Sequence, residues 1–231
     1  PFQHFWPNKE SVEAEVIAHD PLTDLSVLKL KLETRKDRNI PLPFARLGNS
    51  DLLTTGDYVL AMGNPQSLSS SMTLGIVSNP RRVFASFTGA EMQEMDLPGG
   101  HATGTFTRWI QHDALILGGN SGGPLVNLKG EVIGINELGG NGVGFAIPAN
   151  LVAHVLNQAL SHGRVIRGWF GVSLYPVEKM GREDGVLVAS LQPGGPAEQA
   201  GLLPGDVLLS VGGHPIEAIY LPPASDGDRE R

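Results

Sequence analysis

The chain has 231 residues, a formal net charge of −7, 30 glycines, 17 prolines and no cysteine. The acidic balance and the scattered basic residues argue against nucleic acid as a partner, and the absence of cysteine excludes disulfides and thiolate metal sites. The length suffices for one large β domain or a domain and a half, and the glycine and proline content indicates many tight turns between short strands.

The first predicted strands flank an acidic turn. Residues 11–19 alternate, with Val12, Ala14, Val16 and Ala18 expected on one side, and residues 25–32 form a second alternating strand. Asp24 stands directly before this second strand, a placement that suits a buried, oriented carboxylate. The alternative is that Asp20 and Asp24 only shape a turn through their own backbone hydrogen bonds.

The middle of the chain contains more strands and one long irregular segment. Strands are predicted at 58–62, 74–77 and 106–111, and residues 79–104 follow no regular pattern. Long loops in compact domains are more often functional or mobile than idle. We interpret this segment as a regulatory or substrate-side loop, with simple disorder as the alternative.

A single hydroxyl stands among four glycines in Gly118-Gly119-Asn120-Ser121-Gly122-Gly123-Pro124, with apolar runs on either side. Glycine adopts strained backbone angles cheaply and lets a ligand approach the main chain, so Ser121 can be presented there as a nucleophile. A surface turn is the alternative, because glycine, asparagine and serine are ordinary turn residues.

After this loop, residues 125–128 and 131–135 predict a hairpin, and the glycine-rich residues 139–144 lead into 145–147. A long helix is predicted to start at 148–150, with Asn150 as its cap and Gly163 as its stop. Its apolar face is expected to hold Leu151, Val152, Val155, Leu156 and Leu160.

A second domain is predicted to begin near Arg167. Its elements are a strand at 185–191, a short helix at 196–200 and a strand at 206–211.

Six blocks of the sequence resemble the HtrA (Deg) family of serine proteases in order and spacing, over about residues 11 to 211. They are Asp20-Pro-Leu-Thr-Asp24-Leu-Ser-Val-Leu-Lys, Ala61-Met-Gly-Asn-Pro65, Leu74-Gly-Ile-Val-Ser78, Gly119-Asn-Ser121-Gly-Gly-Pro124-Leu, Gly130-Glu-Val-Ile-Gly-Ile-Asn136 and Gly144-Phe-Ala-Ile-Pro148. The resemblance implies a mainly β fold: a chymotrypsin-like double β-barrel, its first barrel incomplete, followed by a partial α+β PDZ domain. The expected division is a protease domain at 1–161, a linker at 162–167 and a partial PDZ domain at 168–231.

The resemblance also implies the parts of a peptide-cleaving site. Ser121 would attack the substrate, Asp24 would orient a histidine base, and the backbone N–H groups of Gly119 and Ser121 would form the oxyanion hole. Leu115 and Ile116 resemble positions at the base of the primary specificity pocket. Since neither is acidic, we expect a small or medium apolar side chain before the scissile bond.

The histidine of the family stands on a Thr-Asn-Xaa-His-Val turn, which the 231 residues do not contain. We expect this turn upstream of Pro1, in a longer parent protein; the competing explanation is a protein that truly lacks it. His4 precedes Asp24 but has none of the motif. We expect His19, His112 and His154 to be solvated or hydrogen-bonded structural residues. The chain alone is therefore expected to be inactive.

Near the second domain, Arg167-Gly-Trp-Phe170-Gly171-Val172 resembles the carboxylate-binding loop of PDZ domains, which bind hydrophobic C-terminal peptides. The alternative is a plain turn that leads into a strand. The residues after Ile216 are too polar and too short to supply the remaining elements of such a domain. We therefore do not expect this chain alone to bind peptide, whereas a longer parent protein is expected to bind C-terminal or internal hydrophobic tails.

Neither a phosphate-binding loop nor a metal-spaced cluster occurs, and no cofactor is implied. The resemblance implies an endopeptidase of the periplasm or cell envelope that acts on unfolded or misfolded proteins. A homotrimer is expected from the family only. The alternative is a non-catalytic, chaperone-like peptide-binding module built on the same barrels.

Overall fold

The computed structural model describes residues 12–35, 38–39, 41–65, 71–83, 104, 107–177, 181 and 184–216. The chain divides into two compact units, Pro1–Ile166 and Arg167–Arg231, each of which is described by itself. The finer division at 161 and 167 stays a prediction. Among the described residues, no helix combines the length and the apolar character needed to cross a membrane.

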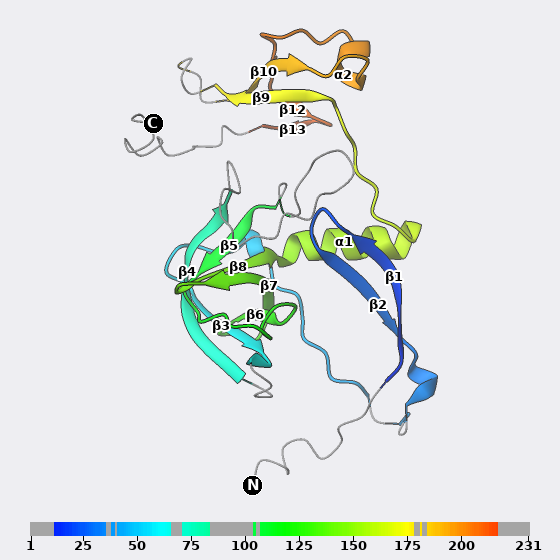
Figure 1. The fold of residues 1–231 in the computed structure, drawn as a ribbon, viewed down its shortest axis with the longest axis vertical. Helices are drawn as coiled ribbons and strands as arrows, with labels where there is room; N and C mark the ends of the chain where they lie inside the picture. Colours follow the sequence, from blue (N-terminus) through cyan, green and yellow to red (C-terminus); the bar gives the residue numbers. More distant parts are fainter. Residues whose placement is uncertain are drawn as a thin grey trace. The chain divides into compact units, whose positions relative to one another are not determined.

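The first unit is built around a closed antiparallel β-barrel (Figure 1). Its strands follow each other in the order β3-β4-β5-β8-β7-β6, and closure leaves no unpaired edge. This barrel confirms the mainly β, chymotrypsin-like fold. The bounds are β3 Tyr58–Gly63, β4 Ser71–Arg82, β5 Trp109–His112, β6 Pro124–Asn127, β7 Val132–Gly140 and β8 Val143–Pro148.

Inward-facing apolar side chains from all parts of the barrel fill its interior. The buried cluster consists of Val59, Ala61, Val77, Ile110, Ala114, Ile116, Leu125, Ile133 and Ala146.

Two predicted boundaries were wrong. Residues 79–82, assigned to the irregular segment, extend β4, and residues 139, 140, 143 and 144, assigned to a loop, pair with one another in β7 and β8. Residues 84–103, which make up most of the predicted regulatory loop, lie outside the described residues.

The hairpin of β1 (Ala14–Asp20) and β2 (Leu25–Leu30) forms a separate two-stranded sheet. Its pairing register shifts between Val16 and Ala18. A β-bulge of this kind turns the following side chains to the other face. As a result Ala18 is buried whereas Val16 is 62% exposed, so the single apolar side predicted for this strand was wrong.

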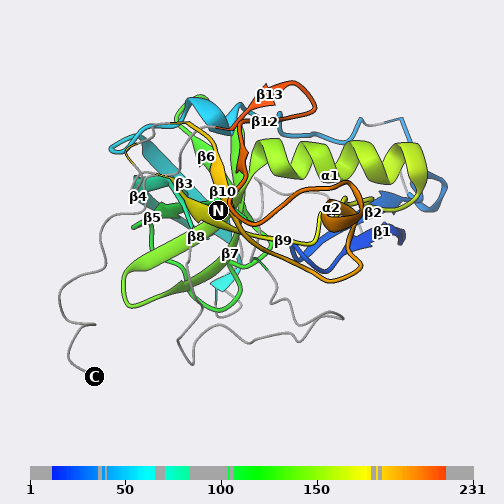
Figure 2. The same cartoon turned by 90° about the horizontal axis from the view of Figure 1, so that it is seen from above.

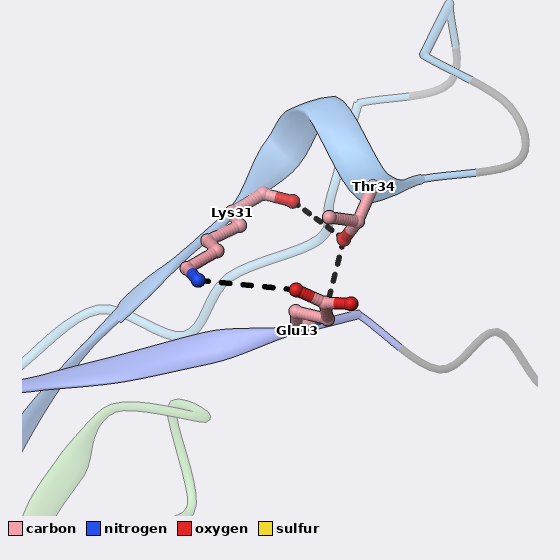
Figure 3. A network of polar contacts seen from close by, with 3 residues as sticks. All are labelled: Glu13, Lys31 and Thr34. Atoms are coloured by element: carbon pink, nitrogen blue, oxygen red, sulfur yellow. Dashed lines mark hydrogen bonds and ion pairs between the residues drawn. The ribbon is translucent and has the colours of Figure 1, made fainter.

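A polar network closes the open end of the hairpin (Figure 3). The Glu13 N–H donates to Thr34 Oγ1 at 3.1 Å, and this hydroxyl donates to the Lys31 carbonyl at 2.7 Å. Lys31 Nζ lies 3.8 Å from Glu13 Oε2, and these side chains are 40% and 70% exposed. Exposed pairs of this kind contribute about 0–1 kcal/mol, so the backbone bonds matter more here than the charges.

Helix α1 (Ala149–His162) joins the barrel to the hairpin, beside which it runs in Figures 1 and 2. Its end at Gly163 is confirmed: this residue has φ 66°, and its N–H bonds the Ala159 carbonyl. Below the helix, a buried cluster brings together residues from β2, β5, β8 and α1: Leu25, Trp109, Ile147 and Val155.

Two expectations about α1 were wrong. The N-cap is Pro148, and the Asn150 side chain instead donates to Asn49 Oδ1 at 2.8 Å and Asp51 Oδ2 at 2.7 Å, near the short helix η3 (Ser50–Leu52). Leu160 was placed on the apolar face, but it is 66% exposed. The buried face is carried by Ala149, Val155 and Ala159.

The second unit contains a three-stranded antiparallel sheet in the order β11-β10-β9. Its elements are β9 Val172–Pro176, β10 Val186–Leu191, α2 Pro196–Gln199 and β11 Val207–Leu208. The strand predicted at 206–211 is divided at Leu209, because β12 (Ser210–Val211) pairs with β13 (His214–Pro215) in a separate sheet.

Val155 tests whether α1 stabilises the first unit through its buried face. We expect Val155→Ala to lower the free energy of unfolding by about 2 kcal/mol, because two buried methyl groups are lost and a cavity remains. Leu160→Ala on the exposed face of the same helix should change it by less than about 0.5 kcal/mol. Urea unfolding followed by circular dichroism measures both, and equal effects would contradict the packing described.

Candidate active site

The Ser121 loop, residues 118–123, packs backbone against backbone on the end of β3. Gly119 has φ 108°, and a Cβ there would lie 2.3 Å from the Asn64 carbonyl oxygen. A Cβ at Gly123 would lie 2.1 Å from the Met62 carbonyl oxygen. No other residue type fits these two positions without moving the main chain, which explains why the serine stands among glycines.

Backbone hydrogen bonds hold both sides of this loop. Asn64 N–H donates to the Gly119 carbonyl at 3.0 Å, Gly122 N–H donates to the Asn136 carbonyl at 2.7 Å, and Asn136 N–H donates to the Gly123 carbonyl at 2.9 Å. The buried Asn136 side chain adds a bond from Nδ2 to the Pro124 carbonyl at 3.1 Å. The loop is thereby fixed to β3 on one side and to β7 on the other.

Ser121 itself is exposed, and its Oγ donates to the Glu137 carbonyl at 2.8 Å. The backbone N–H groups of Gly119 and Ser121 donate to no acceptor within the part of the chain that the structure describes. A hydroxyl and two unused backbone donors therefore lie on one short, rigid loop.

The turn between β1 and β2 contains one buried and one exposed carboxylate. The buried one is Asp20, which accepts a hydrogen bond from Thr23 Oγ1 at 2.5 Å. Asp24, at φ 54°, is exposed, and no described residue donates a hydrogen bond to its carboxylate. The expectation that Asp24 is buried was wrong, because the turn directs Asp20 inward and leaves Asp24 in solvent.

Glu137 is a site residue that the sequence reasoning missed. It lies on β7, and its Oε2 is buried with no hydrogen-bond partner among the described residues. Burial, and after it the negative charge of Asp24, raises the pKa of this carboxyl to about 8. An acid within the otherwise glycine-rich and apolar run 132–140 was the signal available in the sequence.

The histidines do not complete a triad within the described residues. His19 Nδ1 lies 3.2 Å from Ser26 Oγ and His154 Nε2 lies 2.8 Å from Gln158 Nε2, as expected of structural residues. His112 is fully buried and therefore not solvated, and the Asn136 side chain and the Ala114 backbone lie near its ring, as expected of a structural residue. Burial lowers the pKa of His112, which favours a neutral ring.

The two pocket residues predicted upstream of Ser121 differ in position. Ile116 is 6% exposed and packs closely on two glycines. A Cβ added at Gly139 would lie 2.4 Å from the Ile116 Cβ, and a Cβ added at Gly144 would lie 2.8 Å from the Ile116 Cγ1. Leu115 is 48% exposed, and its carbonyl accepts from Thr73 Oγ1 at 2.9 Å. Ile116 thus belongs to the buried core of the barrel, and Leu115 faces solvent.

In the second unit, Phe170 is half exposed, and its carbonyl accepts from Ala197 N–H at 2.9 Å. Gly171 has φ 74°, and its carbonyl accepts from Gln192 N–H at 2.8 Å. Val172 begins β9, which is an outer strand of its sheet within the described residues. Across the described residues, no group of acidic, histidine or cysteine side chains could hold a metal ion.

Gly119 and Gly118 form a matched pair for testing the loop. Gly119→Ala should lower the free energy of unfolding by about 1–3 kcal/mol and speed the exchange of the Asn64 amide, because of the positive φ and the clash with Asn64. A Cβ added at Gly118 would meet no atom within 4 Å, so Gly118→Ala should change the free energy of unfolding by less than about 0.5 kcal/mol. Urea unfolding and amide exchange measure both; an unchanged Gly119→Ala protein would contradict the close packing.

The raised pKa of Glu137 predicts a pH dependence of stability. A carboxyl whose pKa is higher in the folded chain binds more protons when folded, so the free energy of unfolding falls as the pH rises from 4.5 to about 8. The slope should not exceed about 1.4 kcal/mol per pH unit. Urea unfolding of wild type and Glu137→Gln across this range should show the loss only in wild type. Glu131→Gln, on the same hairpin, should retain it.

Comparisons with known proteins agree with this architecture. A family profile described as "Trypsin-like peptidase domain" matches residues 4–135, and one described as "PDZ domain" matches residues 187–220. Proteins named probable periplasmic serine endoprotease DegP-like are similar to this chain. The one from Chlamydia trachomatis is 37% identical over 219 residues (89% of this chain, 39% of the relative), and the one from Ectopseudomonas mendocina is 39% identical over 222 residues (90% and 42%).

Solved structures give the same result in three dimensions. The HtrA-type protease AlgW with a tripeptide is 38% identical with a TM-score of 0.65, over 87% of this chain and 64% of that one. AlgW with a decapeptide is 37% identical with a TM-score of 0.62, over 88% and 60%. The chain spans about two fifths of the length of the curated relatives quoted above. It belongs to the HtrA family of trypsin-like serine proteases with a PDZ domain.

Proposed function

We propose that the first unit carries the nucleophile and the orienting carboxylate of a serine endopeptidase that cleaves unfolded or misfolded proteins by acyl transfer. The observation that carries this proposal is the Ser121 loop, with its exposed hydroxyl and its two unused backbone donors. Ser121 Oγ attacks the scissile carbonyl, and the N–H groups of Gly119 and Ser121 stabilise the oxyanion. Asp24 orients the base that takes the proton from Ser121.

The general base is proposed to be the histidine of the family's Thr-Asn-Xaa-His-Val turn. His19 and His154 are hydrogen-bonded elsewhere, and the buried His112 cannot reach solvent to exchange a proton with substrate. An exposed Asp24 without a hydrogen-bond donor among the described residues is consistent with a carboxylate whose partner is another part of the protein. The 231 residues by themselves would then be inert.

Substrate preference is proposed to follow from Leu115 and Ile116, which resemble positions at the base of the family's primary specificity pocket. Because neither residue is charged, the pocket should accept a small or medium apolar side chain before the scissile bond. Phe170, Gly171 and Val172 are proposed to receive the carboxylate and backbone of a hydrophobic C-terminal peptide. The relatives are named periplasmic, and we propose the same compartment, and a homotrimer, for the parent protein.

Casein hydrolysis tests the need for an external base. A triad enzyme without its general base loses on the order of a millionfold in turnover. We therefore expect the 231-residue chain to cleave casein no faster than its Ser121→Ala variant, as measured by release of a fluorescent label. Hydrolysis at ordinary protease rates that disappears in Ser121→Ala would contradict the role given to the missing histidine.

The rival function is a non-catalytic, chaperone-like peptide-binding module, which is favoured only by the absence of a triad histidine from the described residues. The residues encoded upstream of Pro1 separate the two. A Thr-Asn-Xaa-His-Val turn there, together with fluorophosphonate labelling of Ser121 in that longer protein, supports the enzyme. Absence of both supports the module.

A further inference from the structure

A surface cavity of about 200 Å³ lies in the first unit, where β8 ends and α1 begins. The helix η3, the end of β4 and the residue before β5 complete its lining, which consists of Ser50, Asp51, Pro80, Arg81, Arg108 and Pro148. Typical small-molecule sites measure roughly 300–1,000 Å³, so this cavity suits a small ligand or one group of a larger ligand.

The charge around the cavity is mainly positive, although the chain as a whole is acidic. Arg81 and Arg108 are exposed, and neither forms an ion pair with a described residue. The N-terminal end of α1 adds a partial positive charge, and its first turn carries no acidic residue. The carboxylate of Asp51 is the one negative group in the lining.

Hydrogen bonds hold the η3 side of the cavity against α1. The Asn150 N–H donates to Ser50 Oγ at 3.1 Å, and Asn150 Nδ2 donates to Asp51 Oδ2 at 2.7 Å. Arg81 Nη2 donates only to the Asp51 carbonyl, at a long 3.5 Å. Since each guanidinium offers several N–H donors, both arginines keep donors that no described residue accepts.

We propose that this cavity binds a phosphate group, either as inorganic phosphate or as the phosphate of a small monoester. Guanidinium groups and helix N-termini are the groups that proteins use to hold phosphate oxygens. A phosphate monoester carries a charge of about −1.5 to −2 near pH 7, so its attraction to two arginines outweighs repulsion by the single Asp51 carboxylate. A carboxylate has less charge and should bind more weakly.

This binding site goes beyond the proposed function, because its lining shares no residue with the Ser121 loop. It also predicts effects of opposite sign. Arg81→Gln and Arg108→Gln each remove a positive charge and should weaken phosphate binding. Asp51→Asn removes the opposing negative charge, keeps an oxygen that can accept from Asn150, and should strengthen it.

The test is a nitrogen-15 NMR titration of the 231-residue chain with inorganic phosphate and with glycerol 3-phosphate, at an ionic strength held constant with sodium chloride. We expect saturable shifts at the amides of Ser50, Asp51 and Ala149, which border the cavity. Stronger binding of the free ion or of the monoester tells which form of phosphate the cavity prefers.

The variants are compared through their dissociation constants for inorganic phosphate. Each arginine substitution should raise the constant about three- to tenfold, and Asp51→Asn should lower it about two- to fivefold. Arg164→Gln is the matched control, an exposed arginine just beyond the other end of α1, about 20 Å away along the helix. It should leave the constant unchanged.

The absence of a saturable shift would overturn the proposal, as would equal binding of acetate. Weakening by Arg164→Gln as large as that by Arg108→Gln, or weaker binding in Asp51→Asn, would also contradict it. Since Arg81, Asp51 and Arg108 are exposed, their replacement should leave the fold intact, which the urea midpoint checks.

Discussion

The structure of the site depends on the pairing of the Ser121 loop with β7. Two reciprocal backbone bonds join Gly122 and Gly123 to Asn136, and the carbonyl of the next residue of the strand, Glu137, accepts the Ser121 hydroxyl. A loop rich in glycine has a high conformational entropy when free, so bonds to a rigid strand are needed to hold one geometry. The closed barrel supplies that rigidity, because β7 is itself paired on both sides.

This arrangement also determines the electrostatics of the site. Because β7 holds the Ser121 loop through hydrogen bonds, residues of β7 lie close to Ser121, and one of them is the acid Glu137. Burial, and after it the negative charge of Asp24, favours the neutral form of the Glu137 carboxyl at neutral pH. Membership of the HtrA family explains the loop, the barrel and the PDZ domain.

Strong local patterns let the sequence predict most of the fold. The strand predicted after Asp24 and the stop of α1 at Gly163 appear in the structure, although β2 ends at Leu30 and its burial does not alternate beyond Val27. Predictions failed where a tertiary contact decided the outcome. Asn150 bonds η3 instead of capping α1, and the bulge after Val16 depends on pairing with β2. The burial of Asp20 rather than Asp24, and the position of Glu137, follow from packing between distant strands, which sequence spacing does not reveal.

The barrel and the Asn150 contacts have a consequence for how this chain reaches its folded state. The Asn150 N–H donates to Ser50 Oγ across 100 residues of sequence, and β3 pairs with β6, Val59 opposite Asn127. Contacts so remote in sequence carry a large loop-closure cost and form slowly. During synthesis, β3 and β4 must wait for β5, β6, β7 and β8 before the barrel can close. Until then the edges of these strands are unpaired, and unpaired strand edges are prone to aggregation.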